Sequence, residues 1–190
     1  VNRYRLVGEK YIDISKSGFN YKSRSLYKGK KMLVRKTGIG IYAAITTDLV
    51  YFSQSVFVYK EKNRLLPLKL EYFLGIINSR LMLYYYYLIV GDINWKSFPQ
   101  LTQNTIEKIP IKQVTEQNKH IYDSICRLVM DITTNGYSEE KDMEIENLVF
   151  ELYEITDKEK ECVFDFLKNS VQNLQIIKET RNYNEEKKND

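Results

Sequence analysis

The alternation of apolar and polar residues over the first third of the chain predicts a small antiparallel sheet. Apolar segments at 32–35 and 41–45 flank a Thr37-Gly38-Ile39-Gly40 turn, and glycine permits the positive φ angles that tight hairpin turns need. Residues 50–59 form a further segment rich in β-branched and aromatic side chains, which predicts another strand. We therefore expect residues 32–60 to form the centre of a β-rich unit.

A long apolar helix is predicted to follow this unit. From Leu68 to Leu88, apolar residues recur at spacings of three and four, and others fill much of the remaining circumference. A helix that is apolar nearly all round is buried on several sides. Four consecutive tyrosines, at 84–87, lie within it. We interpret them as packing residues whose hydroxyls reach the rim, rather than as a surface for base stacking.

The character of the chain changes after residue 113. Amphipathic spacing predicts one helix around 121–132 and a second around 145–152, and Thr156-Asp157-Lys158-Glu159 is a capping box that opens a third. Past Ser170 the residues are mostly polar, which predicts a disordered end. The expected fold is mixed α+β, with a β-rich unit and its long buried helix at 1–113, a helical spacer or packing unit at 114–170, and a disordered tail at 171–190.

The net charge of +4 conceals a strong asymmetry along the chain. Residues 1–112 carry 19 Lys and Arg against 7 Asp and Glu, a net of +12, whereas residues 113–190 carry 10 against 18, a net of −8. The segment from Ile14 to Thr47 contains no acidic residue. A basic half predicts a polyanionic partner, although charge alone fits an anionic membrane surface as well. The most apolar segment, 81–91, has 11 uncharged residues and is too short to span a bilayer.

The basic half supplies the candidate contacts with a nucleic acid. Lysine and arginine neutralise phosphates, while interleaved aromatic residues stack or pack against sugars; the alternative is a solvated loop held by its aromatic residues. The predicted phosphate contacts are Lys16, Lys22, Lys28, Lys30 and Lys31. The predicted base or near-base contacts are Arg35, Lys36, Thr37, Tyr42, Gln54 and Trp95. Arginine pairs best with guanine and glutamine with adenine, although Gln54 also fits an ordinary exposed strand position.

Catalytic and metal-binding motifs are not found in the sequence. Its three prolines are never adjacent, which excludes the Asn/Asp-Pro-Pro-Tyr motif of amino-methyltransferases, and one histidine leaves little material for a general-base triad. Cys126 and Cys162 lie far apart, which argues against a zinc site and for a reducing compartment, so we predict a cytoplasmic protein. We interpret one acidic cluster as a solvated helix face; its members are Glu139, Glu140, Asp142 and Glu144.

Five segments follow one another along the chain in a recognisable order. They are Arg3-Tyr4 with Tyr11-Ile12-Asp13, then KMLVRKTG at 31–38, YFSQSVFV at 51–58, LGIINS at 74–79 and KIPI at 108–111. Together they resemble the TaqI-like C-terminal specificity domain of type IIG restriction–modification enzymes and related adenine-N6 DNA methyltransferases. Residues 145–156 also resemble the helical end of those enzymes.

The resemblance implies a recognition domain that places loops in the major groove of double-stranded DNA, beside a methyltransferase domain. It implies that S-adenosylmethionine and Mg²⁺ belong to that catalytic part, with no cofactor and no metal in this chain. We therefore predict a target-recognition domain that directs adenine-N6 methylation, with or without cleavage, by an N-terminal methyltransferase or nuclease part that this chain lacks. The alternatives are a specificity subunit of a type I restriction–modification system and a protein-interaction domain whose basic face docks on an acidic partner.

Overall fold

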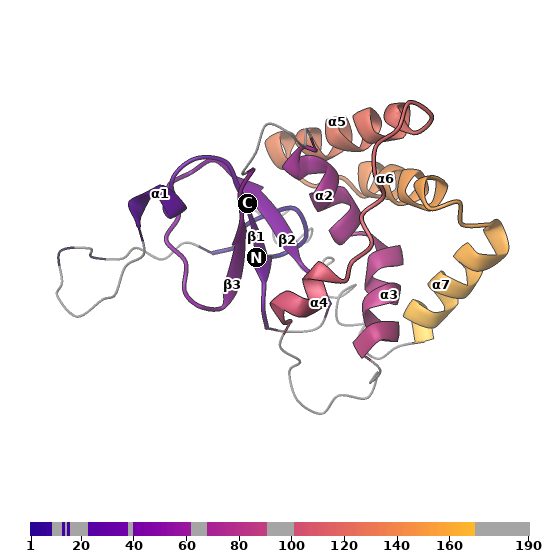
Figure 1. Ribbon diagram of the computed structural model, residues 1–190, viewed down its shortest axis with the longest axis horizontal. Helices are drawn as coiled ribbons and strands as arrows, with labels where there is room; N and C mark the ends of the chain where they lie inside the picture. The colour runs from indigo at the N-terminus through magenta and orange to yellow at the C-terminus, as the bar shows by residue number, and fades with distance from the viewer. Residues whose placement is uncertain are drawn as a thin grey trace, which may run out of the picture.

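The computed structural model describes residues 1–8, 13, 15, 23–37, 40–61, 68–90 and 101–169. A small sheet lies beside a layered set of helices (Figure 1), which confirms the mixed α+β fold. The elements in chain order are α1 (Arg24–Tyr27), β1 (Lys31–Arg35), β2 (Ala43–Thr46), β3 (Val56–Tyr59), α2 (Leu70–Ile77), α3 (Arg80–Val90), α4 (Gln103–Glu107), α5 (Lys119–Asn135), α6 (Glu139–Leu152) and α7 (Asp157–Asn169).

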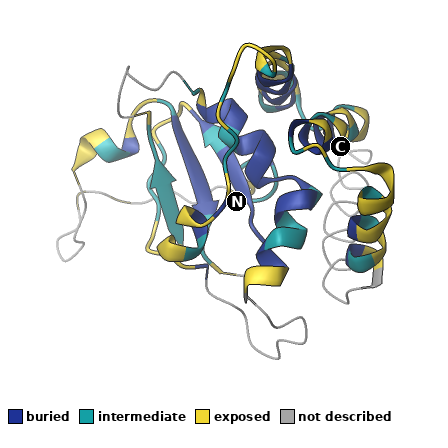
Figure 2. Cartoon of the chain, turned by 45° about the vertical axis from the view of Figure 1, so that its right-hand side comes forward, coloured by how far each residue is buried: buried dark blue, intermediate teal, exposed yellow. Residues whose placement is uncertain are grey.

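The sheet is antiparallel, with the strand order β2-β1-β3. Cross-strand partners share a face of the sheet, and side chains alternate between the two faces along each strand. The face toward the helices carries Met32, Val34, Ala43, Ile45, Phe57 and Tyr59, all of which belong to or pack against the main hydrophobic core. The predicted hairpin between β1 and β2 is confirmed, with Gly38 and Ile39 of its turn outside the described residues. Figure 2 shows that β1 is more deeply buried than β3.

The connection between β2 and β3 has to cross β1, because these two strands lie on opposite sides of it. For this reason only Val56–Tyr59 of the predicted strand at 50–59 pairs in the sheet. Tyr51 and Phe52 instead pack against Tyr27, and their ring centroids lie 4.7 and 4.9 Å, respectively, from that of Tyr27. Tyr51 and Phe52 are therefore held by aromatic packing and not by a strand ladder.

The single long helix expected from Leu68 to Leu88 is two helices, α2 and α3, which break at Asn78 and Ser79. The buried Asn78 side chain accepts a hydrogen bond from the backbone N–H of Ala43 and donates one to its carbonyl, both at 3.0 Å. The Ser79 hydroxyl donates to the Ile76 carbonyl at 2.7 Å and accepts from the first turn of α3. Because the helix breaks here, the Asn78 side chain can form hydrogen bonds with the Ala43 backbone at the outer edge of β2.

The helices from α5 onward pack directly on α2 and α3, so the β-rich unit and the helical unit share one core. Gly75 on α2 marks the closest approach, because a Cβ atom there would lie 2.6 Å from Cγ2 of Ile125 on α5. Tyr84 and Tyr87 on α3 pack against Phe166 on α7. The interpretation of the tyrosine run as packing is therefore confirmed, although the hydroxyl of Tyr87 is buried and does not reach the rim as expected. The three predicted C-terminal helices are also confirmed.

The interpretation of the acidic cluster as solvated is wrong for Asp142. Its side chain on α6 is fully buried and binds Arg3 through two hydrogen bonds of 2.8 Å. Glu146, one turn later and also fully buried, accepts from the backbone N–H of Arg80 at 2.9 Å and lies 3.3 Å from its guanidinium. Burial raises the pKa of Glu146 against the opposing effect of the two arginines. These four side chains, the buried ion cluster, join the N-terminal segment and the α2–α3 break to α6.

Candidate nucleic-acid interface

The strand register places the candidate contacts at two opposite ends of the sheet. Strand β1 begins at Lys31 and ends at Arg35, and because β3 is antiparallel to it, Tyr59 lies near the first end and Val56 at the second. We call the end formed by Arg35 and Val56 the readout end, and the end formed by Lys31 and Tyr59 the α1 end. Among the described residues, the predicted base contacts lie at the readout end, and the predicted phosphate contacts Lys28, Lys30 and Lys31 lie at the α1 end.

Arg35 is held on an aromatic ring at the readout end. Its guanidinium carbon lies 4.2 Å from the ring centroid of Tyr42, and its backbone N–H donates to the Tyr42 carbonyl at 2.9 Å. A guanidinium stacked on a ring in this way keeps its plane fixed. Tyr42 itself is only 5% exposed, which leaves little of the side chain for contact with a base, and that contact stays a prediction. The ring acts as the support on which Arg35 lies.

Lys36 lies on the opposite face of the same strand end. Its ammonium nitrogen is 4.3 Å from the ring centroid of Phe57, a residue on the helix-facing side of the sheet. Its backbone N–H donates to the Ser55 carbonyl at 2.9 Å, and its carbonyl accepts from Leu101 at 2.7 Å. Two consecutive cations are therefore each placed over an aromatic ring, one on each face of the sheet. Thr37, which follows, is exposed.

Gln54 lies in the turn that leads into β3, beside the two cations. Its side chain is exposed. The flanking hydroxyls of Ser53 and Ser55 are 2.6 Å apart, and the Ser53 hydroxyl accepts from the backbone N–H of Ser55 at 3.3 Å. These bonds fix the turn locally and leave the Gln54 amide on its surface. Readout of an adenine by this amide stays a prediction.

Two of the predicted phosphate contacts at the α1 end are already engaged within the protein. Lys31 is fully buried and donates to the carbonyls of Gly29 at 3.2 Å and Asp48 at 2.5 Å, which makes it a poor candidate for the phosphate contact predicted from the sequence. Burial lowers the pKa of Lys31, and the neighbouring Lys60 lowers it further. Lys30 lies 2.8 Å from Glu71 and 3.4 Å from Glu61.

Burial is the largest single effect on Lys30 and lowers the pKa of the ammonium, but the hydrogen bonds and charges of Glu71 and Glu61 together outweigh burial and raise this pKa. A cation already compensated by two carboxylates attracts a phosphate weakly, so Lys30 is a poorer candidate than its sequence position indicated.

Among the residues that the structure describes, Arg24 and Lys28 are the exposed cations at the α1 end. Lys28 was predicted from the sequence, whereas Arg24 was not singled out, because nothing in the pattern distinguishes it from its neighbours in the basic segment. Lys60 was missed as well. Its ammonium donates to the carbonyls of Ser25 at 2.5 Å and Lys28 at 2.6 Å, which ties α1 to the end of β3.

Three predicted contacts, Lys16, Lys22 and Trp95, lie outside the described residues. Within the described parts of the chain, no group of three or more His, Cys, Asp or Glu side chains could hold a metal ion. Among the helices described, none is long and apolar enough to cross a membrane.

Comparison with known proteins identifies the family. A family model described as the TaqI-like C-terminal specificity domain matches residues 1–111, which include the whole sheet and helices α1 to α4. No curated protein matches the chain. A specificity domain implies binding to DNA and association with the catalytic part of a restriction–modification enzyme. Because the match covers more than half of the 190 residues, this chain belongs to the TaqI-like C-terminal specificity domain family, and its role is DNA target recognition.

Proposed function

We propose that the readout end enters the major groove and selects the sequence at which a separate catalytic part methylates adenine at N6. In enzymes of this kind that also cut DNA, the same choice of site directs cleavage. S-adenosylmethionine and Mg²⁺ are assigned to the catalytic part. The residues proposed to reach base edges or the adjoining backbone are Arg35, Lys36, Thr37 and Gln54.

The observation that supports this proposal is the pair of cation–aromatic contacts at one end of β1. The rings of Tyr42 and Phe57 restrict the rotamers of Arg35 and Lys36 before DNA binds. Restricting a long side chain in advance lowers the entropy lost on binding, which is about 0.5–1.5 kcal/mol for each side chain ordered. An arginine fixed in this way can donate two hydrogen bonds to the O6 and N7 atoms of guanine.

The dimensions of the readout end also fit the major groove. The two strands that define this end, β1 and β3, lie about 4.8 Å apart from backbone to backbone. The major groove of B-form DNA is about 12 Å wide and admits a two-stranded β-ribbon. The turn that holds Gln54 and the end of β1 belong to adjacent strands, so both reach the same groove from one direction.

Selection of binding sites from random-sequence duplexes tests this proposal. The wild-type chain is expected to enrich a consensus that contains an adenine, the base to be methylated. Arg35→Ala should lose discrimination at one position of the consensus by about 1–3 kcal/mol, or roughly 5- to 150-fold. Arg127→Ala, which removes an exposed arginine from α5, is the matched control and should leave the consensus unchanged.

Two results would contradict the proposal. Failure of the wild-type chain to enrich any sequence would refute sequence selection by this domain. An unchanged consensus for Arg35→Ala, with the variant folded, would remove Arg35 from the readout.

A further inference from the structure

We infer a second DNA contact, independent of base sequence, at the α1 end. There the side chains of Arg24 and Lys28 bind backbone phosphates that flank the recognised site. The inference rests on the proposed function, because the flank is defined relative to the bases contacted at the readout end.

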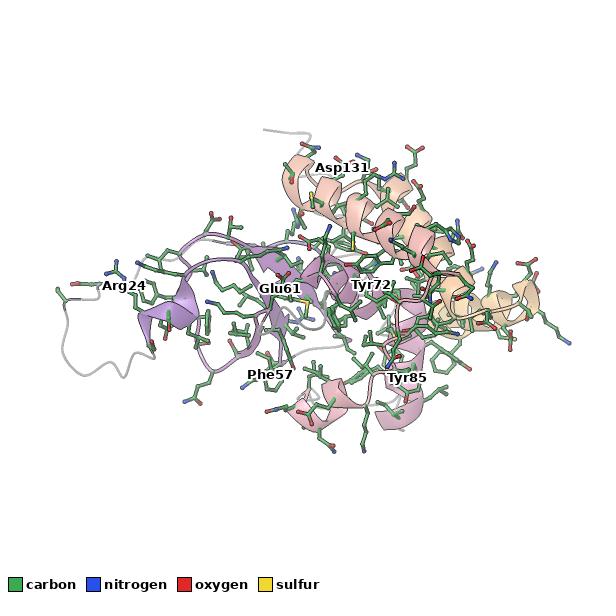
Figure 3. The ribbon with its side chains drawn as sticks, turned by 45° about the horizontal axis from the view of Figure 1, so that its top comes forward. Arg24, Phe57, Glu61, Tyr72, Tyr85 and Asp131 are labelled. Carbon is green, nitrogen blue, oxygen red and sulfur yellow. The ribbon has the colours of Figure 1, made fainter. Side chains whose placement is uncertain are left out.

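Helix α1 is too short to be stable alone, so its position depends on contacts with the rest of the chain. Lys60 supplies one such contact through the carbonyls of Ser25 and Lys28, at 2.5 and 2.6 Å. On the other side, the buried ring of Tyr27 packs against the segment that crosses the sheet. Because these contacts hold α1, the position of the backbone that carries Arg24 and Lys28 is set by the fold. Figure 3 shows Arg24 on the side of the molecule away from the helical unit.

The charges of Arg24 and Lys28 are also available to bind a phosphate. Among the residues that the structure describes, neither forms an ion pair, in contrast to Lys30. The carboxylates at this end are otherwise engaged. Glu71 and Glu61 lie against Lys30. Asp48 accepts a hydrogen bond from the hydroxyl of Thr46 at 3.2 Å.

The separation of the two ends fits one continuous duplex. Strand β1 alone spans about 14 Å from Lys31 to Arg35, and the residues from Lys28 to Lys30 extend this to at most about 23 Å. Successive phosphates on one strand are about 3.4 Å apart along the helix axis. A duplex lying along the sheet would therefore meet the α1 end about four to seven base pairs from the bases read by Arg35.

The acidic surface of helices α6 and α7 disfavours any other orientation of the DNA duplex. Helices α6 and α7 expose many carboxylates to solvent, among them Glu139, Glu140, Glu144, Glu159, Glu161 and Asp165. At physiological ionic strength such charges act over about 8 Å. A duplex is therefore repelled from the helical unit and directed to the sheet, where it can meet both ends.

The first experiment measures the salt dependence of binding to a 30-base-pair duplex of arbitrary sequence. Each phosphate contact contributes about 0.9 to the slope of log K against log salt concentration. Arg24→Ala/Lys28→Ala is expected to reduce the slope by about two. The matched control is Lys158→Ala/Lys168→Ala, which removes two exposed lysines from α7 and should leave the slope unchanged. Equal slopes for the wild type and the α1 variant, or an equal loss in the control, would overturn the inference.

The second experiment locates the contact and does not depend on a change in affinity. A DNA-cleaving reagent attached at Arg24→Cys, in a chain carrying Cys162→Ser, should cut about four to seven base pairs from the position whose selectivity Arg35→Ala changes. The same reagent on native Cys162, which is exposed on α7, is the control and should not cut. Cuts within the recognised bases, or none at all, would refute the flanking contact. If the wild type binds no duplex, the proposed function fails; if it selects a sequence but these two results fail, only the flanking contact is wrong.

Discussion

The buried ion cluster should be among the most sensitive positions for stability. Asp142→Asn is the sharpest perturbation, because it keeps the shape of the side chain and removes one charge. Asp142 accepts two hydrogen bonds of 2.8 Å from Arg3 and one of 3.0 Å from the hydroxyl of Tyr137. Asparagine replaces one acceptor oxygen with a donor, so at least one of these bonds is lost. The two arginines of the cluster are then left with a single carboxylate, that of Glu146.

Removing one partner of a buried ion pair typically costs about 3–5 kcal/mol. We expect the lower end, about 3 kcal/mol, because Glu146 stays within 3.2 Å of Arg3. With an m value of about 3 kcal/mol per M urea for a chain of this size, the midpoint of unfolding should fall by about 1 M. Urea is preferred to guanidinium chloride, because a salt would screen the charges under study.

The matched control is Glu144→Gln, which makes the same change of charge on the same helix at an exposed position. It should alter the free energy of unfolding by less than about 0.5 kcal/mol. The double variant Arg3→Met/Asp142→Leu should be more stable than Asp142→Asn, because an apolar pair leaves no buried charge uncompensated. A midpoint for Asp142→Asn within about 0.2 M of the wild type would show that the cluster does not hold α6 to the N-terminal segment.

Three further predictions concern the readout end, the helix break and the cysteines. Tyr42→Leu should weaken sequence selectivity in duplex selection, whereas Tyr42→Phe should retain it, because only the ring supports the arginine; equal behaviour of the two variants would contradict this. Asn78→Ala should lower the free energy of unfolding by about 2 kcal/mol and speed hydrogen exchange at the Ala43 amide, which loses its acceptor. An unchanged exchange rate would show that the Asn78 side chain does not protect this amide. Ellman's reagent at pH 8 should modify one thiol in the native chain and two after unfolding, because Cys162 is exposed while burial raises the pKa of Cys126 to about 11; two fast-reacting native thiols would refute the burial of Cys126.

Local sequence patterns were sufficient to predict the elements whose formation depends on neighbouring residues. The hairpin around the Thr37–Gly40 turn and the α7 capping box at Thr156 follow from turn and cap chemistry within a few residues, and both are present. The same holds for α5 and α6, whose apolar spacing determines which face is buried. The position of Arg35 and Lys36 at the end of a strand was predictable for the same reason.

Long-range contacts decided the features that the sequence did not predict, namely the break between α2 and α3 and the burial of Asp142. The sequence shows Asn78 as one polar residue in an apolar helix, and only its hydrogen bonds with Ala43, 35 positions away, explain the break there. Asp142 resembles its exposed acidic neighbours until Arg3, 139 positions away, lies against it.

The basic segment at 14–47 shows most clearly the difference between what the sequence determines and what the tertiary structure decides. The sequence by itself determined that residues 14–47 carry positive charge without acidic residues, which favours a polyanionic partner for this half. It did not determine which cations face that partner, because a lysine is equally basic whether it is buried, paired or exposed. The tertiary structure buries Lys31, compensates Lys30 with Glu71, and leaves Lys28 exposed. Charge is a property of composition, whereas the availability of charge depends on which side chains and carbonyls folding brings within a few ångströms.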